Sequence, residues 1–130
     1  MKTDPPDLMM QAIMFRQAMN QPLASFERRN LTLQAHLISE EYIELLDAHV
    51  EALNYPNHDP SKEMCLKELA DLVFVAFQYA AAAGWELDVA LDRVYESNMS
   101  KLVDGKPVKN KSGKVTKGPN YKPPYLADLV

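Results

Sequence analysis

Two short acidic motifs, EEYIE at residues 40–44 and ELAD at residues 68–71, are the parts of this sequence best suited to chemistry. Each motif contains a pair of carboxylates three residues apart, Glu41 and Glu44 in the first and Glu68 and Asp71 in the second, a separation that places both side chains of a pair on one face of a helix. Antiparallel neighbouring helices could bring the two pairs together in a partly dry cleft, where unpaired like charges are costly. A bound divalent cation would stabilise them, and ligands that are all oxygen favour a hard ion. The sequence therefore predicts a Mg²⁺ or Mn²⁺ site made of Glu41, Glu44, Glu68 and Asp71.

Other interpretations of these motifs must be weighed. A single pair of acidic residues on a helix is more often a solvated face than a site. Here both pairs fall where packing residues are expected, which favours the metal site. A di-iron carboxylate bundle would need Glu-x-x-His pairs. The residues three before the three histidines are Leu33, Leu46 and Tyr55, so that class is set aside.

Four helical segments are expected to position these residues. Proline and asparagine break the pattern after the first segment, Asp59 followed by Pro60 predicts a helix start with Asp59 as the cap, and Gly84 predicts a helix end. The spacing of apolar residues places the helices at about residues 8–19, 31–53, 59–83 and 86–102. Tyr42, Ile43, Leu45 and Leu46 are expected to pack the second helix around the site.

The residues after 102 have a different character. Turn-forming pairs recur throughout residues 103–130, and Val108 and Val115 flank a segment that could form a short hairpin. We predict an all-α fold, an antiparallel four-helix bundle over about residues 8–102 with an extended basic C-terminal arm at residues 103–130. The whole chain, residues 1–130, is expected to form a single domain.

Charge is divided unevenly between these parts. Residues 1–100 carry 7 basic and 16 acidic residues, a balance of −9, whereas residues 101–130 carry 7 basic and 2 acidic residues, a balance of +5. A basic arm could bind nucleic acid or fold over an anionic ligand. The single cysteine, the absence of a signal-like N-terminus and the lack of a long apolar run indicate a cytoplasmic protein without a membrane partner.

The fourth segment adds a polar pair, Asn98 and Lys101. Asn98 shares a helical face with Leu91, Val94 and Tyr95, and Lys101 is three residues further on. Asn98 could be a buried amide with its hydrogen bonds made, and Lys101 could favour a helix C-terminus. If both side chains point toward the predicted metal site, they would be suited to bind an anionic ligand there.

In order, the motifs EEYIE, ELAD and the Asn98–Lys101 pair resemble the EExxE…ExxD…NxxK pattern of the all-α nucleoside triphosphate pyrophosphohydrolases. This is the MazG-like superfamily, which includes phosphoribosyl-ATP pyrophosphohydrolase and the dimeric dUTPases. The resemblance covers about residues 8–125, and the tail SNMSKLVDGKPVKNKSGKVTKGPNYKPP is similar to the single-domain branch found in phages and bacteria. It implies Mg²⁺-dependent hydrolysis of a (d)NTP to a nucleoside monophosphate and pyrophosphate.

The resemblance also implies a role for each motif residue. Glu41, Glu44, Glu68 and Asp71 would hold the metal, and Glu40 would position or deprotonate the attacking water. Lys101 would hold phosphate, and Asn98 would contact the nucleotide. Further candidates for binding the substrate are in the arm: Lys106, Lys114, Lys117 and Tyr121, with Tyr125 as a second tyrosine that could stack on a base or simply pack.

The resemblance further implies a homo-oligomer, commonly a dimer of dimers, with the nucleoside triphosphate as the partner and no nucleic acid. If the origin is viral, the compartment would be the host cytoplasm. Methionines in the first helix suit an adaptable interface or a core. The sequence leaves two alternatives open. One is a helical interaction module without enzyme activity whose basic tail binds nucleic acid. The other is the same fold acting on dUTP or phosphoribosyl-ATP, although the tail favours a purine triphosphate, dGTP or GTP.

Overall fold

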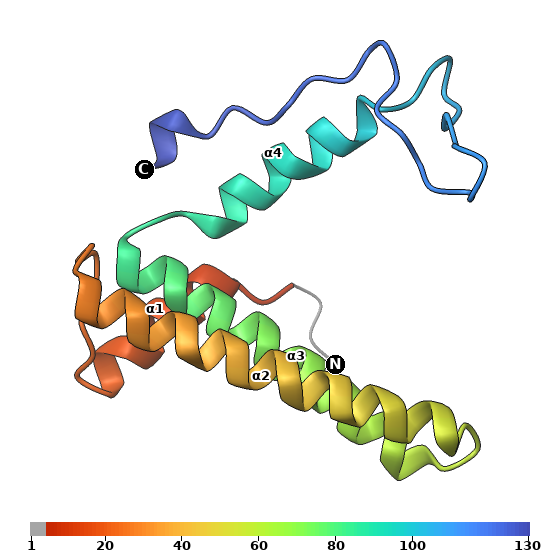
Figure 1. Cartoon of the computed structure of the whole chain (residues 1–130). Coiled ribbons are helices and arrows are strands. Elements are labelled where there is room, and N and C mark those ends of the chain that lie inside the picture. The colour runs from red at the N-terminus through yellow and green to blue at the C-terminus, as the bar shows by residue number, and fades with distance from the viewer. Residues whose placement is uncertain (1–4) are drawn as a thin grey trace. The chain divides into compact units, whose positions relative to one another are not determined.

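The structure, a computed structural model, describes residues 5–130 and contains four α-helices over that range (Figure 1). The helices are α1 (Leu8–Ala18), α2 (Arg28–Asn54), α3 (Asp59–Ala83) and α4 (Leu87–Met99), and a 3-10 helix, η1, spans Ala127–Leu129. No β-strand forms among the described residues, so the predicted all-α class is confirmed. The chain divides into two compact units, Met1–Trp85 and Glu86–Val130, which are described separately. The four-helix bundle and the single domain therefore stay predictions.

In the first unit, α2 and α3 are antiparallel neighbours joined by a tight turn (Figure 1). The turn is closed by a hydrogen bond from the backbone N–H of His58 to the carbonyl oxygen of Tyr55, at 3.0 Å. Near the other end, the Asn30 side chain donates to the carbonyl oxygen of Ala82 at 3.5 Å. Glu41 lies as far along α2 from Asn30 as Asp71 lies back along α3 from Ala82. The antiparallel register therefore sets the two acidic motifs level with each other.

The ends of α3 follow from local chemistry. The prediction that Asp59 caps this helix is wrong by one residue, because His58 is the N-cap and Asp59 and Pro60 occupy the first helical positions. Proline fits there because the first turn leaves its N–H groups unpaired, and the Asp59 carboxylate lies at the positive end of the helix. The predicted stop at Gly84 is confirmed. This residue has a φ of +85°, and the N–H groups of Gly84 and Trp85 each donate to Ala80 at 2.8 Å.

A buried arginine joins α1 to the rest of the first unit. Arg16 is 1% exposed, and its Nε donates to the carbonyl oxygen of Pro22 at 2.7 Å. Its terminal nitrogens donate to Asn30 Oδ1 at 3.2 Å and to Gln78 Oε1 at 3.4 Å. Burial lowers the pKa of Arg16, but a guanidinium remains charged in proteins. One side chain thus holds α1, the following loop, α2 and α3 together.

The hydrophobic core of the first unit is built largely from small side chains. The buried apolar residues are Met9, Ala12, Leu31, Ala48, Phe77, Ala80, Ala81 and Ala82. Several larger apolar side chains are exposed instead. Tyr42, Ile43 and Leu46 are 52%, 55% and 43% exposed, so the expectation that they pack α2 around the site is wrong for the single chain.

None of the described helices is by itself long and apolar enough to cross a membrane, although α3 and α4 pass on length and composition when taken as a bent pair.

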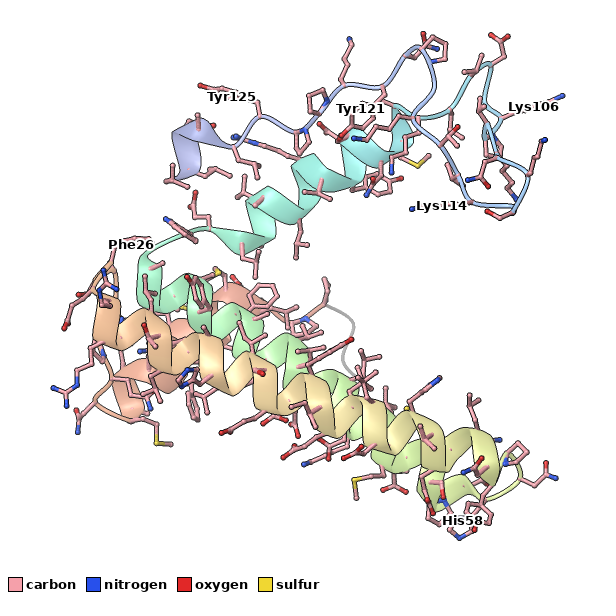
Figure 2. All side chains as sticks on the ribbon, viewed as in Figure 1. Phe26, His58, Lys106, Lys114, Tyr121 and Tyr125 are labelled. Atoms are coloured by element: carbon pink, nitrogen blue, oxygen red, sulfur yellow. The ribbon has the colours of Figure 1, made fainter. Side chains whose placement is uncertain are left out.

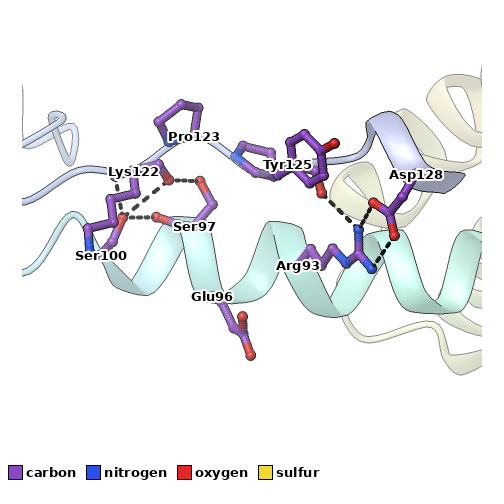
Figure 3. A pocket seen from close by; sticks show the side chains of 9 residues that line it. Arg93, Glu96, Ser97, Ser100, Lys122, Pro123, Tyr125 and Asp128 are labelled. Atoms are coloured by element: carbon purple, nitrogen blue, oxygen red, sulfur yellow. Dashed lines mark hydrogen bonds and ion pairs between the residues drawn. The ribbon is translucent and has the colours of Figure 1, made fainter.

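In the second unit, the C-terminal arm returns along α4 and is bonded to it (Figure 3). The Ser97 hydroxyl donates to the carbonyl oxygen of Lys122 at 2.7 Å, and the Lys122 N–H donates to Ser100 Oγ at 2.8 Å. Arg93 donates to Asp128 Oδ2 at 3.0 Å and to the carbonyl oxygen of Tyr125 at 3.0 Å. The hydrogen bond from Arg93 lowers the pKa of Asp128.

Two local predictions about the second unit need correction. We expected the last helix to reach about residue 102, but it ends at Met99, where the Ser100 hydroxyl donates to the Ser97 carbonyl at 2.6 Å. The predicted hairpin is present as a turn without strands. Its register is shifted by one residue from a Val108–Val115 pairing, because Val108 accepts from the Thr116 N–H at 2.7 Å.

Candidate metal centre

The two acidic motifs meet between α2 and α3. Glu41 and Glu44 are one turn apart on α2, and Glu68 and Asp71 are one turn apart on α3. Each of the four offers one carboxylate oxygen, and these four oxygens all lie within 4.8 Å of one another. We call these residues the carboxylate cluster. The predicted meeting of the two pairs is therefore present in the structure, and their role as metal ligands stays a prediction.

Burial differs sharply among the four carboxylates. Glu68 is 7% exposed, Glu41 and Asp71 are half-buried, and Glu44 is exposed. The buried oxygens Glu41 Oε2 and Glu68 Oε2 have no hydrogen-bond partner among the described residues. A buried charged oxygen without a partner is costly, and gathered carboxylates repel one another. The donor set therefore fits a hard divalent cation with oxygen ligands.

Lys67 is the basic residue paired with the carboxylate cluster in the described part of the chain. Its Nζ lies 2.8 Å from Asp71 Oδ2 and 3.4 Å from Glu68 Oε1. The hydrogen bond with Asp71, followed by the charges of Asp71 and Glu68, raises the pKa of Lys67. The Lys67 side chain is 60% exposed, so it reaches the cluster from the solvent side. Sequence reasoning missed this residue, although a lysine four residues before an aspartate on a helix is a recognisable signal.

The predicted water-handling residue, Glu40, lies outside the carboxylate cluster. It follows Ser39 on α2 and is exposed, as expected for a residue that borders the face of the helix carrying Glu41 and Glu44. Its side chain is therefore accessible to water beside the two α2 members of the cluster. The catalytic role of Glu40 stays a prediction.

The remaining predicted residues belong to the second unit (Figure 2). Asn98 is exposed in the last turn of α4, and Lys101 is half-buried just beyond the helix. Lys106 and Lys114 are exposed in the arm, whereas Lys117 places its Nζ 4.9 Å from the centre of the half-buried Tyr121 ring. The structure thus brings Lys117 and Tyr121 together within the arm. The roles of all these residues toward a substrate stay predictions.

Sequence reasoning also missed the residues that fix the arm. Arg93 and Asp128 form an ion pair although 35 positions separate them, and no local pattern connects them. Together with Ser97, Ser100 and Lys122, they line a hollow of about 390 Å³ between α4 and the arm (Figure 3). Long-range pairs of this kind become visible only once the chain is folded.

Paired carboxylates that face each other across two antiparallel helices are the arrangement that the resemblance to the all-α nucleotide pyrophosphohydrolases implies. The sequence profile of phosphoribosyl-ATP pyrophosphohydrolase matches residues 9–98, well over half of the chain. The chain therefore belongs to the phosphoribosyl-ATP pyrophosphohydrolase family, which confirms the resemblance and indicates a nucleotide pyrophosphohydrolase. A search of curated proteins found no match.

Proposed function

We propose that this protein hydrolyses a nucleoside triphosphate to a nucleoside monophosphate and pyrophosphate, with Mg²⁺ or Mn²⁺ held by the carboxylate cluster. The observation that supports this most directly is the approach of four carboxylate oxygens within 4.8 Å, two of whose residues carry buried oxygens without partners. Membership of the phosphoribosyl-ATP pyrophosphohydrolase family supplies the reaction class.

The proposed role of the carboxylate cluster is to bind the metal. Glu41, Glu44, Glu68 and Asp71 would hold the metal, which supplies charge neutralisation for the polyphosphate and for the leaving pyrophosphate. Rigid helices suit this task because the ligand oxygens are already close before the substrate arrives. Glu68, the most buried of the four, anchors the set from the α3 side.

Glu40 would handle the nucleophile. A water oxygen forms a bond to the α-phosphorus, and the bond from that phosphorus to the bridging oxygen breaks, so that pyrophosphate leaves. The proton released from the water passes to the Glu40 carboxylate. The exposed position of Glu40 beside Glu41 leaves it accessible to solvent water for this role.

Residues of the second unit would bind the anionic part of the substrate. Asn98 and Lys101 would contact the nucleotide and its phosphates, and Lys106, Lys114 and Lys117 would add positive charge along the polyphosphate. Tyr121, with Lys117 over its ring, would offer a flat face to a base.

Two substrate classes remain as candidates for the same site. The similarity of the tail to the phage and bacterial single-domain branch favours a purine triphosphate, with dGTP or GTP first. The family profile, by its description, favours phosphoribosyl-ATP. Both reactions break the bond between the α- and β-phosphates, so one chemistry would serve either substrate.

A substrate panel tests the proposal directly. The protein is incubated with Mg²⁺ and each of the dNTPs, the NTPs, dUTP and phosphoribosyl-ATP, and monophosphate and pyrophosphate are measured by chromatography. We expect equal amounts of the two products from at least one substrate, and no product after EDTA treatment until Mg²⁺ is restored. Release of inorganic phosphate instead of pyrophosphate would contradict the proposed bond cleavage. No product from any substrate would favour the non-enzymatic interaction module.

A further inference from the structure

Lys67 lies at the edge of the carboxylate cluster, and its role there rests on the proposed metal role of that cluster. Lys67 contacts one member of the cluster at 2.8 Å and another at 3.4 Å, from a position that is 60% exposed. One contact is with Asp71 Oδ2 and the other with Glu68 Oε1, so Lys67 reaches both carboxylates that α3 contributes to the cluster. The single positive charge of the Lys67 ammonium therefore offsets part of the negative charge of the four carboxylates.

Helix stability alone gives a weak reason for this arrangement. In the pair with Asp71, the lysine precedes the acid by four residues, which is the less favourable order along a helix. The side chain is also exposed, so solvent and salt screen the attraction. What distinguishes Lys67 from Lys62 on the same helix is its partners. Among the described residues, Lys62 pairs only with Asp59, at 4.0 Å, and the Asp59 side chain is 94% exposed and outside the cluster.

Glu68 divides its two oxygens between two environments. Oε1 lies 3.4 Å from the Lys67 ammonium, whereas Oε2 is buried without a partner. A cation bound by all four carboxylates would draw both α3 side chains toward it and would repel the neighbouring ammonium, because like charges at this range oppose each other. The long, exposed lysine side chain can swing into water while the carboxylates hold the cation.

We propose that Lys67 is a tethered counter-ion that occupies the edge of the carboxylate cluster in the metal-free protein and is displaced when a divalent cation binds. It stabilises the cluster when no metal is present and competes with the metal for Glu68 and Asp71. Lys67 thereby sets the metal concentration at which the site fills. Its departure also leaves an ammonium group beside the site at the moment when an anionic substrate could bind there.

Two measurements on the full-length protein test this without relying on turnover. First, the affinity for Mn²⁺ alone is measured by electron paramagnetic resonance for the wild type, for Lys67→Gln and for the matched control Lys62→Gln. Second, acetylation of each lysine by acetic anhydride is followed by mass spectrometry with and without Mg²⁺, with Lys62 as the internal control.

We expect Lys67→Gln to bind Mn²⁺ about two- to five-fold more tightly, since it removes a competing ion pair of surface strength, and Lys62→Gln to match the wild type. We also expect Mg²⁺ to increase acetylation of Lys67 and not of Lys62. Unchanged or weaker Mn²⁺ binding by Lys67→Gln would overturn the proposal. Tighter Mn²⁺ binding by Lys67→Gln with no change in the acetylation of wild-type Lys67 would also overturn the proposal, because the loss of a positive charge would then explain the affinity without any displacement of Lys67. If the wild type binds no Mn²⁺ at all, the proposed metal centre itself fails.

Discussion

At the scale of single residues, the carboxylate cluster is the feature that the sequence predicted best. The three-residue spacing within each pair determines which side chains share a helical face, and that rule holds whatever surrounds the helix. The degree of burial was not predictable in the same way. Glu68 is buried and Glu44 is exposed, although each belongs to a pair with the same three-residue spacing, because burial depends on neighbouring helices and not on spacing.

Neutralising one metal ligand should separate catalysis from stability. We expect Glu41→Gln or Asp71→Asn to lower turnover by at least about 100-fold, because a primary ligand is lost. The melting temperature of metal-free Glu41→Gln should stay the same or rise by up to about 4 °C, because this substitution relieves repulsion between like charges. Turnover is measured by pyrophosphate release, and melting by circular dichroism in EDTA.

Glu63→Gln is the matched control for this prediction. Glu63 is exposed on α3 and does not belong to the carboxylate cluster, so its substitution should leave turnover near the wild-type value. Near-normal activity in both cluster variants would mean that the metal is held elsewhere.

Glu40 should behave differently from its neighbour Glu41. We expect Glu40→Gln to bind Mn²⁺ like the wild type while turnover falls by about 100- to 10,000-fold, the usual contribution of a general base. Metal binding is followed by electron paramagnetic resonance and turnover by pyrophosphate release. If Glu40→Gln loses Mn²⁺ binding as well, Glu40 is a metal ligand.

At the scale of elements, the sequence predicted the positions of the helices well. It predicted less well at which residues the helices end and which groups hold those ends. Gly84 ends α3 as expected, since glycine adopts a positive φ without strain. The early end of α4 was not predictable, because Ser100 is held by Lys122 in the arm, 22 residues away. Helix ends that depend on distant segments leave no local pattern.

Gly84 should be intolerant of a larger side chain. A Cβ atom there would lie 2.9 Å from Ala24 Cα and would also require a φ of +85°. We expect Gly84→Ala to lower the free energy of unfolding by about 1–3 kcal/mol, measured by urea titration. Gly113→Ala is the control, since Gly113 has a φ of +83° but a Cβ atom added there would meet no described atom within 4 Å beyond its chain neighbours. An equal loss in both variants would show that the contact with Ala24 costs nothing.

The end of the arm should respond to acid. Because Arg93 lowers the pKa of Asp128, this ion pair stabilises the arm fully above the usual carboxylate pKa. That contribution is lost as the pH falls through the lowered value. A carbon-detected NMR titration of the Asp128 carboxyl should give a midpoint below the usual aspartate value, and Arg93→Gln should move it back up. An unchanged midpoint in Arg93→Gln would exclude Arg93 as the cause.

At the scale of the whole molecule, the described surface is rich in large apolar side chains. Leu66, Leu69, Val73 and Phe74 are each more than 40% exposed and line an apolar groove of about 350 Å³ between α1 and α3. Apolar patches of this kind usually mark an interface. The oligomer was a prediction from the resemblance, since the spacing of apolar residues does not reveal whether a helix face meets its own chain or another one.

Sedimentation should therefore show association. We expect a species of about two or four times the 14.7 kDa chain mass by analytical ultracentrifugation. Leu66→Glu should shift it toward the single chain, because a charge would be buried in the contact, whereas Lys62→Glu on the same helix should not. A wild-type protein that stays at the single-chain mass at micromolar concentration would contradict this expectation.

The hairpin of α2 and α3 has a consequence for how the protein is assembled. All four carboxylates lie between residues 41 and 71, on two consecutive helices joined by one short turn. Contacts this close along the sequence form early in folding, because little chain entropy is lost in closing them. The proposed metal centre can therefore be complete before residues 72–130 have all left the ribosome. A cation present at that stage would stabilise the nascent hairpin before the rest of the chain is available to support it.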